Sequence, residues 1–142
     1  MKSTIHVEGA PKAIGPYRQA QLVRLHGGQK MLFSAGQIGL DPATMTLVEG
    51  GVTEQAERVF QNLAAVLAGA GLGFGDVVKT TVYLADMEDF KAMNAVYAQY
   101  FTQDLPARTT IAAKGLPAGA RVEIEVVAIG REIGRASCRE RV

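Results

Sequence analysis

Apolar residues recur at steps of three and four between residues 56 and 70, which is the spacing of one face of an α-helix. Thr53 is expected to cap this helix, with Glu54 placing a negative charge in its first turn. The glycine-rich segment GAGLGFGD that follows lacks the spacing of a nucleotide-binding loop, and it is interpreted as the helix end and a turn. The apolar stripe that must pack against the rest of the protein consists of Ala56, Val59, Phe60, Leu63, Val66, Leu67 and Ala70.

A second helix is predicted after residue 89, again from helical spacing of apolar residues. Asp86 and Asp89 resemble a capping box at its start. Asn94 is unusual because it lies on the apolar face, and a buried amide has to be hydrogen-bonded. We therefore expect Asn94 to tie down a loop or to line a polar pocket. The residues predicted to face the core are Phe90, Met93, Tyr97, Tyr100 and Phe101.

Strands are predicted on both sides of these helices. Residues 19–41 read as two strands around a Gly27-Gly28 turn, with Met31 and Phe33 on the face opposite to Leu32 and Ser34. Further strands are predicted at 76–86, 107–113 and 121–130. The element order ββ-α-β-α-ββ indicates an α+β fold, with the helices on one face of a mixed sheet.

The last predicted strand carries large apolar residues on both of its faces. Glu123, Glu125, Val127 and Ile129 point to one side, and the intervening residues point to the other. A sheet that is covered by helices on one face leaves the other face to water or to a partner. Apolar residues on both faces indicate more burial than a monomer gives, so a homo-oligomer is expected.

Composition narrows the class of protein. The chain has 142 residues, 48% of them hydrophobic and 20% charged, with a formal net charge of +1. These values are typical of one globular domain. With no long apolar run and no signal-like N-terminus, a cytoplasmic protein without membrane contact is expected. A net charge of +1 with no basic run argues against a dedicated nucleic-acid surface. Cys138 is the only cysteine, so no internal disulfide or thiolate metal site is predicted.

The C-terminal residues 132–142, EIGRASCRERV, have neither strand alternation nor a helical face. One reverse translation of this segment resembles a common sequencing-adapter sequence read in frame. Our hypothesis is a single domain over residues 1–131, followed by a non-native tail that includes the only cysteine.

Few residues could carry chemistry. His6 and His26 lack metal-ligand spacing, and Ser34 has no nucleophile-elbow motif around it, so neither a metal enzyme nor a serine hydrolase is predicted. Arg108 and Glu123 remain, on the last two strands. If those strands pair, the two side chains could come near each other, or each could face a neighbouring subunit.

The alternative reading of Arg108 and Glu123 is a structural one. A cross-strand salt bridge would use the same residue types, and Arg121 is a competing partner for the glutamates. Tyr17 follows a Gly-Pro turn, where its ring and hydroxyl could line a cleft or simply pack at an edge. From the residues alone both interpretations stay open.

Several segments together resemble the Rid proteins, the reactive intermediate deaminases also called the YjgF family. They run in order from about residue 8 to residue 130, and the P-x-R pattern is similar to that of the RidA-type branch. The resemblance implies a chorismate-mutase-like fold and a homotrimer with ligand clefts between subunits. The matching segments are GAPKAIGPYRQA, FSAGQIGLDP, VKTTVYLADMEDFKAMNAVYAQYF, PARTTIAAKGLP and VEIEVVA.

The resemblance also implies an activity without a cofactor or a metal. Rid proteins hydrolyse 2-imino and enamine acids, such as 2-aminoacrylate and 2-iminobutanoate, to 2-keto acids and ammonia. By the same resemblance, Arg108 is the carboxylate-binding residue and Glu123 the residue that positions or activates water. Tyr17 would lie at the cleft mouth, Asn94 near the site, and the backbone of Gly36 beside the ligand.

Two positions depart from the family pattern. Ala35 stands where serine is common, and Thr110 where cysteine is common. Two other functions stay open beside the deaminase. The same cleft could bind small carboxylates without turnover, as in a sensing or interaction protein. Ribonuclease activity has been attached to some family members, although the neutral charge and the lack of a histidine pair speak against it here.

Overall fold

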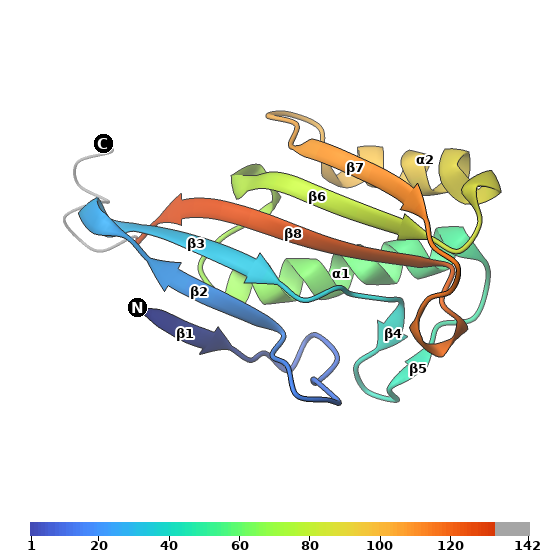
Figure 1. The fold of residues 1–142 in the computed structure, drawn as a ribbon, viewed down its shortest axis with the longest axis horizontal. Helices are drawn as coiled ribbons and strands as arrows, with labels where there is room; N and C mark the ends of the chain where they lie inside the picture. The colour runs from blue at the N-terminus through green and yellow to red at the C-terminus, as the bar shows by residue number, and fades with distance from the viewer. Residues whose placement is uncertain (133–142) are drawn as a thin grey trace.

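A single mixed sheet of six strands is the main feature of the computed structural model, which describes residues 1–132 (Figure 1). The strand order is β1-β2-β3-β8-β6-β7, antiparallel except for the parallel pair β6 and β7. Both helices lie on one face of this sheet, behind it in the view of Figure 1. The predicted fold class, a mixed sheet with two helices on one face, is confirmed.

The strands and helices have the following bounds. The six-stranded sheet contains β1 (Lys2–Ile5), β2 (Ala20–Arg24), β3 (Gln29–Ser34), β6 (Val77–Leu84), β7 (Ala107–Ala112) and β8 (Val122–Arg131). A small separate hairpin is formed by β4 (Leu40–Asp41) and β5 (Thr46–Leu47). The helices are α1 (Val52–Gly69) and α2 (Phe90–Tyr100). Single 3-10 turns are η1 (His26–Gly28), η2 (Phe74–Asp76), η3 (Met87–Asp89) and η4 (Pro117–Gly119).

Helix α1 packs the predicted apolar stripe against the sheet, and all seven residues of that stripe are buried. Phe60 lies at the centre of an aromatic cluster, stacked on Tyr100 with 4.6 Å between ring centroids. The edges of Phe74, Tyr97 and Phe101 also meet Phe60. These contacts join α1 to α2 and bury the rings that the spacing of α2 placed on its inner face.

Three details of the predicted secondary structure and helix caps were wrong. The predicted order lacked β1 and the β4–β5 hairpin, because strands of two to four residues give too short an alternation to recognise. Helix α1 begins after Gly51 and not after Thr53: the Glu54 carboxylate accepts a hydrogen bond from the Gly51 N–H at 2.8 Å. Asp86 does cap the turn before α2, but Asp89 pairs with Arg121 instead of completing a capping box.

The face of the sheet away from the helices carries an apolar patch. Met31 lies opposite both Val23 and Ile129, and Phe33 lies opposite Val127. The Phe33 side chain is 42% exposed in the single chain. Apolar residues therefore lie on the helix-free face of β8 as well as on its buried face, as the pattern of the last strand predicts. Neither helix of the described chain has the length and apolar character that a membrane span needs.

Candidate active site

A pocket of about 540 Å³ opens beside Glu123, at the start of β8. Three segments that are far apart in the sequence form its walls: the loop after β1, the loop after β3 and the turn η4. Most of the lining is apolar, and Glu123 is the acidic group in it. The lining residues are Pro11, Lys12, Ile14, Tyr17, Gln19, Ala35, Gly36, Gln37, Ile38, Leu40, Met45, Pro117, Ala118 and Glu123.

Gly36 and Glu123 are held against each other by a short backbone bridge. The N–H of Gln37 donates to the carbonyl of Ile124 at 2.9 Å, and the N–H of Ile124 donates to the carbonyl of Gln37 at 3.0 Å. A Cβ atom at Gly36 would lie only 2.8 Å from the carboxyl carbon of Glu123. Position 36 therefore has room for a hydrogen only, and the glycine leaves the carboxylate open to the pocket. The structure thus brings together two residues that the family resemblance named separately.

Glu123 is half-buried on the helix-free face of the sheet, next to Glu125 on the same face. Burial, and then the neighbouring Glu125 carboxylate, raise the pKa of Glu123. Within residues 1–132, no Lys, Arg or His lies within ion-pair distance of Glu123. The pKa of Glu123 therefore lies closer to neutral pH than that of an ordinary glutamate. Such a carboxyl group suits a role in which a proton is both accepted and returned.

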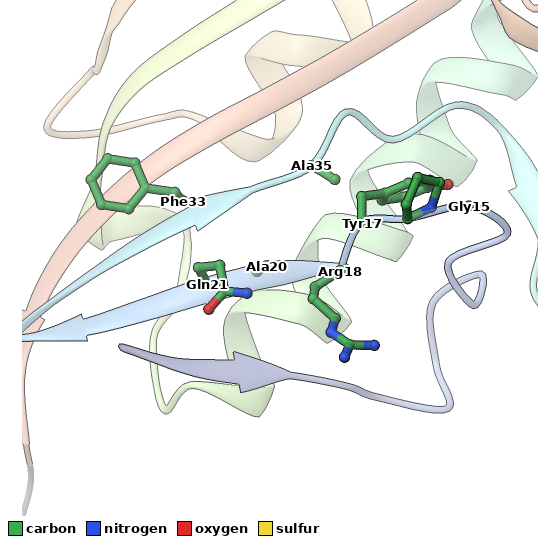
Figure 2. Close-up of a pocket in the computed structure, with 8 residues that line it drawn as sticks. Gly15, Tyr17, Arg18, Ala20, Gln21, Phe33 and Ala35 are labelled. Atoms are coloured by element: carbon green, nitrogen blue, oxygen red, sulfur yellow. The ribbon is translucent and has the colours of Figure 1, made fainter. Parts of the chain in front are cut away.

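Tyr17 separates the Glu123 pocket from a second pocket of about 520 Å³, which Figure 2 shows. The ring is 49% exposed and lines both cavities together with Ala35. On the far side of Tyr17, the second pocket is lined by Arg18, Gln21 and other residues that are drawn in Figure 2. Tyr17 therefore borders the Glu123 pocket, whereas its position after the Gly-Pro turn had left both a cleft and edge packing open.

Three buried amide side chains fix the walls of the Glu123 pocket. Gln19 is 3% exposed, and its Nε2 donates to the Pro11 carbonyl at 2.9 Å within the loop after β1. Asn62 of α1 is fully buried and donates to the Ile38 carbonyl at 3.2 Å in the loop after β3. A buried backbone carbonyl without a hydrogen-bond donor destabilises the fold. In the two loops these amide side chains supply the donors that a neighbouring strand would supply in a regular sheet.

The third amide belongs to Gln55, also on α1. Its Oε1 accepts a hydrogen bond from the Arg121 N–H at 2.8 Å, two residues before Glu123. The guanidinium of Arg121 pairs with Asp89 at 2.9 Å. Arg121 is thus not the competing partner of the glutamates that the sequence allowed, because Asp89 holds it on the helix side.

Arg108 lies outside this pocket, on the edge strand β7 and beside α2. Its Nη1 donates to Asn94 Oδ1 at 2.7 Å. The guanidinium carbon lies 4.6 Å from the ring centroid of Tyr97 and 5.5 Å from that of Phe90. No carboxylate of residues 1–132 forms an ion pair with Arg108. One amide and two aromatic rings therefore orient the planar guanidinium of Arg108. Its remaining N–H groups can donate hydrogen bonds to an anion.

The expectation that Asn94 is a buried amide was wrong, because the residue is exposed. Its role as a hydrogen-bonding partner is nevertheless observed, since it orients Arg108. Near Arg108, the Thr110 hydroxyl oxygen is buried and has no hydrogen-bond partner among the described residues. Thr110 is one of the two departures from the family pattern, and its hydroxyl lies on the same face of β7 as Arg108.

Arg108 and Glu123 do not meet within one chain, which corrects the prediction that their strands pair. Strand β7 pairs with β6, and β6 lies between β7 and β8. Arg108 stands opposite Thr80, whose hydroxyl is bonded to Tyr97 on the helix side, whereas Glu123 stands opposite Tyr83 on the helix-free side. The short connection between β7 and β8 misled the prediction because it crosses over one strand.

The histidines lie outside both groups of residues. His6 follows β1, and His26 lies in the turn between β2 and β3, at the other end of strand β2. Over residues 1–132, no three His, Cys, Asp or Glu side chains gather in a way that could hold a metal ion. The chemistry that the described residues offer is an anion-binding guanidinium and a half-buried carboxyl group in an apolar pocket.

Comparisons with known proteins agree on one family. A family model described as endoribonuclease L-PSP matches residues 7–130. The human protein named 2-iminobutanoate/2-iminopropanoate deaminase is 44% identical over 137 residues, which cover 96% of this chain and 96% of that protein. Protein DfrA of Myxococcus xanthus is 52% identical over 90% of this chain and 95% of its own. A crystal structure of a conserved Rid-family protein from Yersinia pestis superposes with a TM-score of 0.82, at 41% identity over 90% of this chain and 98% of that one.

Proposed function

Because this chain belongs to the endoribonuclease L-PSP family, which includes the Rid proteins, we propose that it hydrolyses 2-imino and enamine acids to 2-keto acids and ammonia. Its substrates are 2-aminoacrylate with its imine 2-iminopropanoate, and 2-iminobutanoate. The name of the human relative states this reaction, and that relative matches nearly the whole chain. The observation that carries the proposal is the Arg108 guanidinium, which Asn94 and Tyr97 orient and which has no ion-pair partner among residues 1–132.

Arg108 binds the substrate carboxylate. A guanidinium presents two parallel N–H groups to the two oxygens of a carboxylate, and this fixes the plane of the acid. The adjacent C=N carbon is then held at a defined distance and direction from the attacking water. Lysine would supply the charge without this orientation.

Glu123 moves the proton. Its carboxylate takes a proton from water as the oxygen bonds to the C=N carbon of the protonated imine and the π electrons pass to nitrogen. The resulting carbinolamine receives that proton on nitrogen. The C–N bond then breaks as ammonia leaves, the hydroxyl proton returns to the Glu123 carboxylate as the keto group forms, and this proton departs with the ammonia as ammonium. A raised pKa suits both halves of this cycle, because the carboxyl group must give back what it accepted.

We propose that each site is shared by two chains of a homotrimer. Arg108 and Glu123 lie on opposite faces of the sheet and on strands that are not neighbours, so they cannot meet within one chain. At each proposed site, one chain therefore contributes Arg108 and a second chain contributes Glu123. Arg108 stands on the edge strand, where a second chain can approach, and the apolar patch around Phe33 gives that chain a surface to cover.

The proposal uses only residues 1–131, since every site residue precedes Glu132. The suspected tail lies outside the described residues except for Glu132, which pairs with Arg24 at 2.7 Å. We also propose a cytoplasmic location, because a scavenger of reactive imines must act where pyridoxal-phosphate enzymes release them.

The activity is tested by forming 2-iminobutanoate in situ with a threonine dehydratase. Semicarbazide is added as a competitor that traps the imine, and release of 2-ketobutyrate is followed. The protein is expected to accelerate release of the keto acid and to lower the yield of semicarbazone. An unchanged rate at every protein concentration would leave the alternative of a small-carboxylate binder, which needs Arg108 but no proton-transfer group.

The ribonuclease reading rests on the family description and on the names of similar structures, such as the putative endoribonuclease of Thermotoga maritima. His6 and His26 lie at opposite ends of strand β2 and cannot act as a pair in one chain. RNA cleavage that disappears on further purification would dispose of it.

Gly36→Ala is expected to lower kcat/KM by at least about tenfold, because a methyl group there displaces the Glu123 carboxyl from the pocket. Gly73→Ala is the matched control: no atom lies within 4 Å of the Cβ position at Gly73, and activity should be unchanged. Both variants are compared in the semicarbazide assay, with thermal unfolding as a check on folding. Equal activity in Gly36→Ala and the wild type would contradict the assigned place of Glu123.

A further inference from the structure

A second acidic residue and a tyrosine surround Glu123 on the helix-free face of the sheet. Glu125 follows Glu123 on the same face of β8, about 7 Å further along the strand. Tyr83 of β6 stands directly opposite Glu123, yet its hydroxyl donates to Glu125 Oε1 at 3.3 Å. The tyrosine therefore spans both carboxylates and holds Glu125 at a fixed place beside Glu123.

On the basis of the proposed function, we propose that Glu125, held by the Tyr83 hydroxyl, is a positioning residue that sets how readily Glu123 keeps its proton. Neither carboxylate has an ion-pair partner within residues 1–132. Two carboxylates at this separation repel each other, and the repulsion favours the protonated form of whichever is more buried. Glu123 is that residue, because it borders the apolar pocket.

Within one chain, no cation of residues 1–132 lies within ion-pair distance of either carboxylate. On β6, Lys79 is held by the Thr109 hydroxyl of β7 at 2.9 Å, and the Cα partner of Glu125 is the uncharged Thr81. On the other side of β8, the bridging residue is the neutral Gln37. Of the residues that line the pocket with Glu123, the ionisable ones are Lys12 and Tyr17, both on the loop after β1.

The pKa values of Glu123 and Tyr83 are both raised, which agrees with this arrangement. Burial and then Glu125 raise the pKa of Glu123. Burial, and then Glu125 and Glu123, raise the pKa of Tyr83, so its hydroxyl stays protonated and remains a donor. The loss of the Glu125 charge must therefore lower the pKa of Glu123, and the base form of Glu123 then persists to lower pH.

The test compares the pH profile of kcat/KM for 2-iminobutanoate in wild type and Glu125→Gln. The acid limb is expected to move to lower pH by about half to one unit in the variant. Glu125→Asp keeps the charge but shortens its reach to Tyr83, so its limb should lie between those of wild type and Glu125→Gln. Thr81→Val changes packing at the same place without changing charge, and it should leave the limb in place.

Tyr83→Phe checks the proposal by a second route, because it frees Glu125 without removing the carboxylate. The limb should move in the same direction by a smaller amount, and Tyr83→Phe should add nothing in the Glu125→Gln background. An unmoved limb in both variants, or an equal movement in Thr81→Val, would overturn the proposal. The position of the acid limb also distinguishes a changed pKa of Glu123 from a structural defect. A structural defect would lower activity at every pH alike.

Titration of the Glu123 carboxyl group by carbon-13 NMR gives the same answer without turnover. A lower midpoint in Glu125→Gln supports the coupling even if wild type proves inactive, in which case the proposed function alone fails. An unchanged midpoint in an active enzyme overturns the role of Glu125 and leaves the deaminase in place. Size-exclusion chromatography of each variant confirms that assembly is the same.

Discussion

Arg108→Ala is expected to lower kcat/KM for 2-iminobutanoate by about a hundredfold to a thousandfold. Removal of one partner of a charge-assisted pair typically costs about 2–5 kcal/mol, and each 1.36 kcal/mol is a factor of about ten in rate. The fold should survive, because the side chain lies at a sheet edge and binds only the exposed Asn94 and two ring faces. Steady-state kinetics with semicarbazide competition measures the loss.

Arg108→Lys separates charge from geometry. A lysine keeps one positive charge but loses the planar fork, so it should recover only a small part of the activity. Arg24→Ala is the matched control, since Arg24 pairs with Glu132 away from both groups of site residues. Wild-type activity in Arg108→Ala would remove the carboxylate anchor from the account.

Glu123→Gln is expected to lower kcat by about a hundredfold to ten-thousandfold, the usual range for the loss of one general acid–base group. Affinity for 2-ketobutyrate should change little, because glutamine keeps the size of the side chain and Arg108 still holds the carboxylate. Calorimetric titration with 2-ketobutyrate, together with the kinetics, separates the two effects. Glu88→Gln, an exposed glutamate in η3, serves as the control.

The same experiment discriminates between the two functions left open by the sequence. A pure binder would show no turnover in wild type and equal binding in Glu123→Gln. A deaminase shows turnover in wild type and a loss that is confined to kcat. Full turnover in the glutamine variant would show that another group moves the proton.

The fold was largely predictable from the chain, because the helices and longer strands have strong periodicity. The stripe from Ala56 to Ala70 and the Gly27-Gly28 hairpin are local patterns that burial and turn geometry decide. The family resemblance then brought Arg108, Glu123, Tyr17 and Gly36 forward as candidates. The contact of Gly36 with Glu123 is observed in the structure.

The geometry around those candidates was not predictable. Whether β7 pairs with β8 or with β6 depends on the register of strands that are distant in sequence, and this placed Arg108 on the opposite face from Glu123. The loop anchors Gln55 and Asn62 carry no local signal, since a glutamine or asparagine in an amphipathic helix usually faces solvent. The role of Tyr83 also has no local signal, because its hydrogen bond to Glu125 joins two strands that are far apart in sequence.

Two chains together build each proposed site, and mixing two inactive variants tests this sharing most directly. Arg108→Ala retains Glu123, and Glu123→Gln retains Arg108, so neither forms a complete site alone. When the two are refolded together in equal amounts, random assembly should pair an intact Arg108 with an intact Glu123 in about a quarter of the sites. We predict recovery of about a quarter of wild-type activity. A mixture that forms mixed oligomers yet stays as inactive as its components would contradict the shared site.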